Sequence, residues 1–292
     1  MTDTDNYIPD TDNYIPDTDT YIPDTDTYIQ MMRVSQPLME PTVCSAIQAL
    51  QLPSGSRGLD AGCGIGLQAL WLAEAVGPTG HVTGLDISPE FLLHAEEIVK
   101  KSGFSEQISF QEGDVSKLPF DDDTFDWAWS SSCAGYSASL EPLPVVKELT
   151  RVVKPGGSVA IFVWSSENLL PGHPLLEARL NATSSGIAPF IKGKRSELHF
   201  LRALGWFRDA GLEETTARTF AGDAYAPLTD DLRCALIALF EMRWQGVESE
   251  LTQEDWAEYQ RLCLPESPEF ILNHPDYYAF FTCSMFHGRV TK

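Results

Sequence analysis

From residue 57 onward, short runs of apolar residues alternate with longer segments in which apolar residues recur at helical spacing. The short runs predict strands and the longer segments predict helices. Ser88 and Pro89 suit the first positions of a helix, while Gly77 and Gly103 suit the position after the last helical turn. The predicted strands are 57–60, 81–87, 108–113, 125–130 and 158–164, and the predicted helices are 67–76, 89–101 and 143–154.

The repeated order of strand, helix and strand favours a parallel sheet, because right-handed crossovers then place helices on both of its faces. Further along, residues 215–220 and 277–290 predict two more strands, and residues 197–210 predict a helix. Residues 166–196 and 226–276 are interpreted as insertions, the second of them mostly helical. The expected fold class is therefore α/β, with a doubly wound, seven-stranded, mostly parallel sheet and helical insertions that form a lid.

The first thirty residues differ from the rest of the chain. Residues 4–31 form four seven-residue copies: TDNYIPD twice, then TDTYIPD and TDTYIQM. Recurrent proline and abundant Asp and Thr exclude a coiled coil despite the seven-residue period. We therefore expect residues 1–30 to be a disordered acidic tail and residues 31–292 to be the folded domain. The alternative is that the repeated Tyr-Ile peptide docks on a partner. The last copy leads into the folded domain, and five residues there are expected to pack over the active site: Tyr28, Ile29, Met31, Met32 and Val34.

The charge of the chain limits its partners. Its 20 basic and 42 acidic side chains give a net charge of −22, which disfavours nucleic acid and anionic membrane surfaces as partners. The longest apolar runs have six residues, whereas a membrane span needs about 20. The six cysteines are scattered without a CxxC pair, which favours reduced thiols over disulfides or a zinc site. Because the N-terminus also has no secretory signal pattern, we expect a cytoplasmic protein. The scattered cysteines also lead us to expect no bound metal.

The most informative stretch is the turn that follows the first predicted strand. It reads Asp-Ala-Gly-Cys-Gly-Ile-Gly over residues 60–66, and its glycines allow a sharp turn and close approach of a ligand to the main chain. The spacing is GxGxG rather than the GxGxxG of dinucleotide binding. Asp60, directly before the turn, would repel a pyrophosphate but would favour a ligand that carries an ammonium or sulfonium group.

Two further acids follow neighbouring strands. Asp86 ends the second predicted strand, where a carboxylate can accept both hydroxyls of a ribose, and Asp114 ends the third, where it can accept an adenine amino group. The carboxyl ends of adjacent parallel strands are also where open α/β sheets bind ligands. Three acids in this arrangement predict one shared ligand site.

With these motifs the chain resembles a known family. DAGCGIG, GLDIS, EGDVSKLPFDDDTFD and ELTRVVKPGG are similar to the motif series of class I S-adenosylmethionine-dependent methyltransferases, in particular the small-molecule branch that includes the ubiquinone and menaquinone biosynthesis methyltransferases (type 11-like). The resemblance covers residues 57–165. It implies a Rossmann-like methyltransferase fold, S-adenosyl-L-methionine as the cofactor, and methyl transfer to a small organic acceptor by in-line displacement at the sulfonium methyl.

The resemblance also implies roles for individual residues. The glycine turn would line the methionine end of the cofactor, Asp86 would hold the ribose, and Ser130 would face the methionine part and the substrate. The full set of implied cofactor-binding residues is Asp60, Gly62, Cys63, Gly64, Gly66, Asp86, Ile87, Asp114, Val115 and Ser130. Gly58 departs from the family, which has an aliphatic strand residue there, so the first strand is expected to be frayed.

The sequence leaves the catalytic chemistry open. An activated methyl group requires mainly an acceptor held about 3 Å away in line and shielded from water, so a general base is optional. The candidates for such a base are His173, Tyr136 and His287, although each also fits a packing or surface role. Trp127 and Trp129 share one face of the fourth strand and are expected to pack in the core.

Aromatic residues after residue 200 suggest an apolar pocket for a flat or greasy acceptor, built from some of Trp206, Phe207, Trp244, Trp256, Tyr259, Phe270, Tyr277, Tyr278, Phe280 and Phe281. Two alternatives to a methyltransferase remain. One is a regulatory protein that binds S-adenosylmethionine without catalysis. The other is an NAD-dependent oxidoreductase, which the GxGxG spacing disfavours.

Deleting residues 1–24 should leave folding and cofactor binding intact, because the composition of that segment cannot support a packed core. Melting temperature and calorimetric affinity for S-adenosylhomocysteine, measured for the full and truncated chains, check this. A large fall in melting temperature would show that the repeats dock on the fold.

Overall fold

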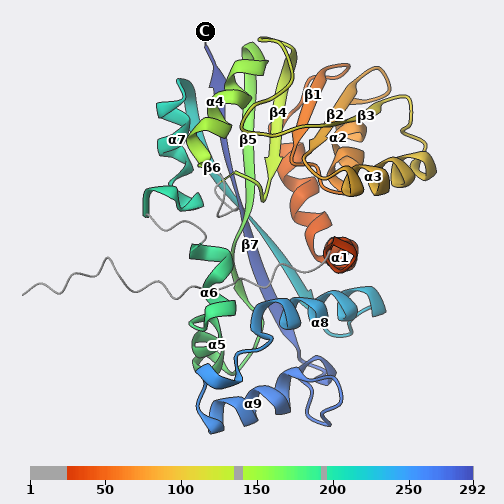
Figure 1. Cartoon of the computed structure of the whole chain (residues 1–292). Coiled ribbons are helices and arrows are strands. Elements are labelled where there is room, and N and C mark those ends of the chain that lie inside the picture. The colour runs from red at the N-terminus through yellow and green to blue at the C-terminus, as the bar shows by residue number, and fades with distance from the viewer. Residues whose placement is uncertain (1–24, 135–140, 192–195, 292) are drawn as a thin grey trace, which may run out of the picture.

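The structure is a computed structural model that describes residues 25–134, 141–191 and 196–291 (Figure 1). The first three repeat copies and Tyr136 lie outside these residues. The last copy is helical, because α1 extends over Thr25–Leu50. The boundary expected after residue 30 therefore falls inside a helix, and the folded domain already includes the last repeat copy.

Seven strands form one sheet in the order β3-β2-β1-β4-β5-β7-β6, and β7 runs antiparallel to both of its neighbours. The expected seven-stranded, mostly parallel α/β sheet is confirmed. The strands are β1 (Arg57–Ala61), β2 (His81–Asp86), β3 (Ile108–Glu112), β4 (Phe125–Ser131), β5 (Val153–Asn168), β6 (Leu212–Tyr225) and β7 (Tyr278–Val290).

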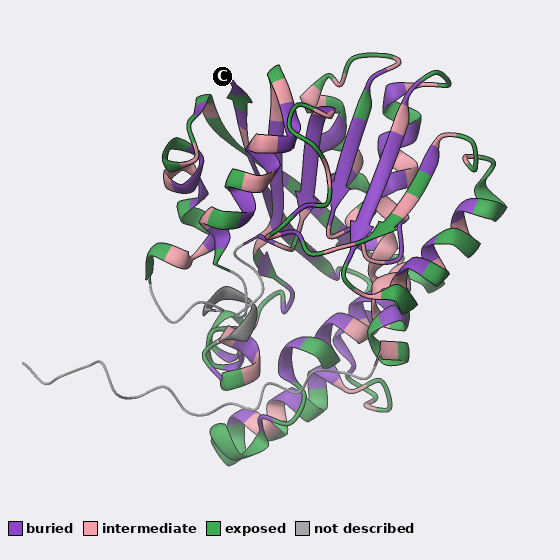
Figure 2. Cartoon of the chain, turned by 45° about the horizontal axis from the view of Figure 1, so that its top comes forward, coloured by how far each residue is buried: buried purple, intermediate pink, exposed green. Residues whose placement is uncertain are grey.

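Helices cover both faces of the sheet, and the central strands are largely buried (Figure 2). Apolar side chains fill the layers between the sheet and the helices. On one face lie α1, α2 (Leu67–Val76) and α3 (Pro89–Ser102); on the other lie α4 (Pro142–Val152) and α7 (Ala203–Asp209). The helix predicted over 197–210 is shorter than expected, because two 3₁₀ turns at Ser196–Leu198 and Phe200–Arg202 precede α7.

Three strands continue beyond the parallel part of the sheet. β5 extends to Asn168 and β6 to Tyr225, so both are longer than predicted, and the pairing of β5 with β7 shifts register between Trp164 and Ser166. The insertions pack around this extension as α5 (Pro174–Asn181), α6 (Ser184–Ile191), α8 (Asp230–Trp244) and α9 (Gln253–Cys263), with 3₁₀ turns at Glu248–Glu250 and Ile271–Asn273 (Figure 1). The first insertion thus begins after Asn168 rather than at residue 166.

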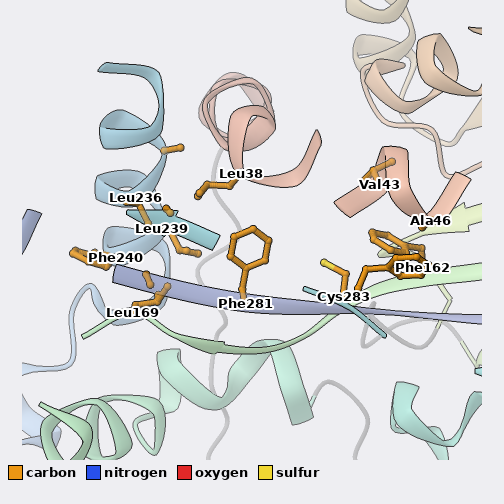
Figure 3. Close-up of a cluster of buried hydrophobic side chains, with 14 of the residues drawn as sticks. Leu38, Val43, Ala46, Phe162, Leu169, Leu236, Leu239, Phe240, Phe281 and Cys283 are labelled. Carbon is orange, nitrogen blue, oxygen red and sulfur yellow. The ribbon is translucent and has the colours of Figure 1, made fainter. Parts of the chain in front are cut away.

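The helical insertions, which we call the lid, share one continuous apolar core with α1, α2 and β7. Leu236, Leu239 and Phe240 of α8 pack with Leu38 of α1 and Phe281 of β7 (Figure 3). Because α8 and α1 share this cluster, the N-terminal helix and the second insertion are fixed to one another. No helix within the described ranges has both the length and the apolar character needed to cross a membrane.

The expectation of a frayed first strand is wrong. β1 pairs with β2 on one side and with β4 on the other, and Gly58 lies directly opposite Trp127. A Cβ at Gly58 would lie 2.0 Å from the Trp127 ring. The indole is fully buried and donates to Ser56 Oγ at 2.9 Å. Gly58 is therefore required by the adjacent tryptophan. Trp127 and Trp129 both lie in the core, as predicted.

Gly58→Ala should destabilise the protein by about 1–3 kcal/mol, because the added methyl group overlaps a fixed indole. Chemical denaturation gives the free energy of unfolding. The matched control is Gly205→Ala, where no atom lies within 4 Å of the added Cβ and α7 gains helix propensity. The double variant Gly58→Ala/Trp127→Leu should cost less than the sum of its single substitutions; strict additivity would contradict the proposed overlap.

Candidate functional site

The glycine turn lies flat across the ends of β1 and β2. The N–H groups of Gly62 and Cys63 both donate to the Leu85 carbonyl, at 2.8 and 3.0 Å. Gly62, Gly64 and Gly66 have φ values of +78°, +54° and +74°, which L side chains rarely adopt. A Cβ at Gly62 would also lie 2.9 Å from Cys133 Sγ. The turn thus requires glycine on both conformational and steric grounds, and it exposes main chain to a ligand.

The Asp86 carboxylate holds this turn in place. Its Oδ2 accepts the N–H of Gly64 at 2.8 Å, and its Oδ1 accepts the N–H of Ser88 at 3.0 Å. Ser88 Oγ in turn accepts the N–H of Phe91 as the N-cap of α3. One side chain therefore fixes both the glycine turn and the start of the following helix.

The neighbouring acid, Asp60, differs from Asp86 in its hydrogen bonding and its protonation. It is 1% exposed, and its Oδ2 has no hydrogen-bond partner among the described residues. Burial, with a contribution from the charge of Asp86, raises the pKa of Asp60 to about 7. A buried carboxyl without a partner is costly unless a ligand supplies a donor or a positive charge.

Asp114 lies on an exposed turn after β3. Its Oδ1 accepts the N–H and the Oγ–H of Ser116, at 2.8 and 2.7 Å, and these bonds lower its pKa. Val115 beside it is buried, whereas Ile87 is 68% exposed. A large, exposed apolar side chain between two acids fits one face of an aromatic ring.

These elements surround a cavity of about 570 Å³. Eight of the ten predicted cofactor residues line it: Asp60, Gly62, Cys63, Gly64, Asp86, Ile87, Asp114 and Val115. Gly66 does not; it is the N-cap of α2, and a Cβ there would lie 2.8 Å from the Phe110 ring.

Ser130 does not line the cavity either. It is fully buried, and its Oγ donates to the Ala61 carbonyl at 2.9 Å, which ties β4 to β1. The strand alternation that turns Ser130 inward brings Ser131 into the cavity wall, followed by Ser132 and Cys133. The expectation that Ser130 faces the ligand is wrong, and the residue after it takes that place.

The three candidate bases are not brought together. His173 precedes α5, and its Nδ1 lies 2.8 Å from Glu258 Oε1 of α9, so it joins two lid helices. His287 lies in β7 opposite Ala160 and Thr216, and burial lowers its pKa. Neither histidine lines the cavity, and Tyr136 lies outside the described residues.

The N-terminal helix covers the cavity. Tyr28, Met31 and Met32 of α1 line it, Ile29 is buried, and Val34 is partly buried outside the lining. The Tyr28 ring stacks on Phe91 with centroids 5.7 Å apart. A Cβ at Gly64 would lie 3.2 Å from Met32 Sδ, so the methionine rests directly on the glycine turn. Together these side chains screen the turn from solvent.

The far end of the cavity was not anticipated from the sequence. Its wall includes Trp164 and Glu167 of β5 and Met242 and Arg243 of α8. None of the ten aromatic residues proposed for an acceptor pocket lines it; eight of them are buried in or packed against the two apolar cores. The apolar wall is formed instead by shorter side chains, among them Leu38, Met39, Ala238 and Leu239. No residue pattern marked Glu167, because β5 was expected to end at residue 164.

The cavity fits the donor that the resemblance implies. The buried Oδ2 of Asp60 provides an acceptor for a cationic group. Exposed Ile87 provides an apolar surface for an aromatic ring such as adenine. The Asp86 carboxylate lies between them along the strand ends. A ligand with positive charge at one end and an aromatic base at the other matches this sequence of groups.

Comparisons with known proteins give a consistent result. A family model described as a methyltransferase domain matches residues 59–157. A demethylmenaquinone methyltransferase of Bacillus subtilis is 41% identical over 193 residues, covering 62% of this chain and 81% of the relative. A sterol 24-C-methyltransferase of Gibberella zeae is 33% identical over 206 residues, covering 66% of this chain and 51% of the relative. The chain thus spans about half the length of that sterol enzyme.

Solved structures share the fold at low sequence identity. A SAM dependent methyltransferase from Aquifex aeolicus superposes with a TM-score of 0.51 at 17% identity, covering 90% of this chain and 98% of the other. The YcgJ protein from Bacillus subtilis superposes with a TM-score of 0.53 at 17% identity, covering 87% of this chain and 99% of the other.

The stability of the free protein should fall as pH rises from about 5 to 8, relative to that of Asp60→Asn. An Asp titrates near 3.9 in an unfolded chain but at about 7 here, so the folded state retains a proton that the unfolded state has lost within this window. The difference should be on the order of 3 kcal/mol. Urea denaturation at several pH values measures it. Parallel pH profiles for the two proteins would contradict the assigned titration of Asp60.

Proposed function

The chain belongs to the class I S-adenosylmethionine-dependent methyltransferases, and from that membership we propose that the acids at the ends of β1, β2 and β3 hold the methyl donor, while the acceptor lies beside β5 and α8. The protein is an enzyme that transfers a methyl group from S-adenosylmethionine to a small molecule. When bound, this donor supplies an electrophilic methyl group on a positively charged sulfur.

The observation that carries the proposed donor placement is the buried Oδ2 of Asp60, which has no partner among the described residues. A cationic methionine end beside it provides the missing charge compensation. The next acid, Asp86, is positioned to accept the ribose hydroxyls. Ile87, Val115 and Asp114 then surround the base, with the Asp114 carboxylate as the acceptor for its amino group.

The acceptor is proposed to be apolar. The cavity wall opposite the acids is formed by methionine, leucine and tryptophan side chains from α1, α2, α8 and β5. A wall of this kind gains free energy from burying a hydrophobic molecule and offers few polar groups that would require pairing. The relatives named as sterol and demethylmenaquinone methyltransferases are consistent with such an acceptor.

The chain contributes positioning and exclusion of water. In-line attack needs the acceptor atom held about 3 Å from the methyl group, and such positioning alone can supply roughly 7–11 kcal/mol. α1 covers the glycine turn and packs against α8, so helices cover the turn and the part of the cavity beside β5. We therefore propose that α1 and α8 act together to hold the two substrates and exclude solvent.

Two further proposals, on cellular location and on binding partners, rest on the composition of the chain alone. A cytoplasmic location is proposed because the six cysteines occur without a disulfide pattern. A net charge of −22 disfavours nucleic acid as a partner. Contacts of the N-terminal repeats with another protein remain a hypothesis from the repeated Tyr-Ile motif.

Three experiments test the proposed function. Calorimetry with S-adenosylmethionine and S-adenosylhomocysteine tests donor binding, and a thermal-shift comparison with NAD tests the oxidoreductase alternative. Transfer of a labelled methyl group to a panel of flat apolar acceptors, followed by mass spectrometry, tests acceptor class. Binding of the donor without any labelled product would favour the non-catalytic alternative, and absence of binding would overturn the assignment of the cavity.

Asp86→Ala should weaken S-adenosylhomocysteine binding by about tenfold or more, because hydrogen bonds to a charged group contribute about 1.5–3 kcal/mol. Part of the loss comes from releasing the Gly64 N–H that Asp86 holds. Isothermal calorimetry measures the effect, with Asp209→Ala on the exposed end of α7 as the control. Near-normal affinity in Asp86→Ala would contradict the ribose role.

A further inference from the structure

A buried ion pair lies in the apolar wall of the cavity. Glu167 of β5 accepts a hydrogen bond from Nε of Arg243 of α8 on Oε1, and one from Nε1 of Trp164 on Oε2 at 2.8 Å. The side chains of Glu167 and Arg243 are each 2% exposed, and both residues line the cavity together with Trp164. The pair joins the extended part of the sheet to the lid.

The location of this pair sets it apart from the other carboxylates of the cavity. Asp60 and Asp86 lie at the ends of β1 and β2 and Asp114 follows β3, whereas Glu167 lies on β5, which is three strands from β2 in the sheet order. Three strand spacings amount to about 14 Å. Among the described lining residues, Glu167 is the carboxylate on the side where the acceptor is proposed to lie.

Packing alone gives no reason for the pair. A buried ion pair contributes little net stability compared with apolar residues of the same size, since desolvation of both charges offsets their attraction. The surrounding wall is apolar, with Leu239 and Met242 on the same helix as Arg243. Because a buried carboxylate in an apolar wall carries this desolvation cost, we infer that Glu167 interacts with the molecule that binds in the cavity.

The bonding of Glu167 leaves it able to accept a proton. A carboxylate offers about four lone-pair sites, and the two hydrogen bonds occupy one on each oxygen. Desolvation raises the pKa of Glu167, whereas the guanidinium of Arg243 and the hydrogen bond from Trp164 lower it, and the carboxyl of Glu177 on α5 also interacts with this pair. The net direction is upward, toward a more basic carboxylate.

We propose that Glu167 accepts the proton of an acidic hydroxyl on the apolar acceptor, with Arg243 and Trp164 as positioning residues that orient its carboxylate. The inference rests on the proposed function. The O–H bond of the acceptor breaks and its proton passes to Glu167. The electron pair left on the acceptor forms the new bond to the methyl group, and the pair of the broken carbon–sulfur bond stays on sulfur.

Binding of a probe tests this without depending on turnover. With S-adenosylhomocysteine present, the full chain should bind 1-naphthol about tenfold or more tightly than 1-methoxynaphthalene, which has no hydroxyl proton to donate. Glu167→Gln should lose most of this preference, since a neutral amide is a weaker acceptor than a carboxylate. Equal binding of the two naphthalenes to the unmodified protein, or binding of neither, would overturn the proposal.

Because Glu167→Gln removes the negative charge that faces the buried guanidinium of Arg243, it can also destabilise the fold. The double variant Glu167→Gln/Arg243→Gln removes both charges, and circular dichroism checks that it folds. If the pair is merely structural, the double variant keeps the hydroxyl preference; if Glu167 takes the proton, the preference stays lost. The matched control is Glu258→Gln, a glutamate of α9 that pairs with His173 and does not line the cavity.

Turnover gives a second readout. With 1-naphthol and 1,4-dihydroxynaphthalene as acceptors and labelled donor, Glu167→Gln should lower kcat about 10²–10⁴-fold, while S-adenosylhomocysteine affinity stays within threefold of the unmodified protein. An unchanged kcat would overturn the role of Glu167 alone. If the unmodified protein does not bind S-adenosylhomocysteine, the proposed function is overturned instead, so the two failures are distinguishable.

Discussion

The end of the cavity where the methyl donor is proposed to bind depends on one carboxylate that accepts two main-chain N–H groups. Asp86 holds Gly64 on one oxygen and Ser88 on the other, so the glycine turn and the start of α3 are fixed by the same side chain. Its charge also acts on its neighbours, since it helps to raise the pKa of Asp60 and that of Tyr28. Asp86 therefore fixes the position of the turn and adds to the effect of burial, which is the main cause of the raised pKa values of Asp60 and Tyr28.

A second constraint operates at the opposite end of the cavity. The sheet continues past its parallel part because β5, β6 and β7 are longer than the strands beside them, and both helical insertions pack on this extension. α8 is thereby fixed against α1, and Arg243 is brought to Glu167. The enzyme thus covers part of its cavity with helices from distant parts of the chain, and the extended sheet supports both of them.

Much of the fold could be predicted because its signals are local. Ser88 and Gly103 mark the ends of α3 by their own conformational preferences, and the alternation of apolar runs identifies the parallel strands. The prediction was wrong at Gly58, where a glycine suggested a frayed strand. Glycine is required at this position because a larger residue would overlap the indole of Trp127. Trp127 is distant in sequence and is adjacent only across the sheet.

The sequence by itself determined the end of the cavity that we propose for the donor, since the glycine turn and the three acids lie at the ends of consecutive strands, and parallel topology alone brings such positions together. Only the tertiary structure decided the rest. Ser130 turns inward because of the pleat of β4, and α1 covers the turn because its apolar face packs on α8. Glu167 and Arg243 are separated by 76 residues and meet only through the folding of the lid. Contacts across such separations are set by packing, which no local pattern encodes.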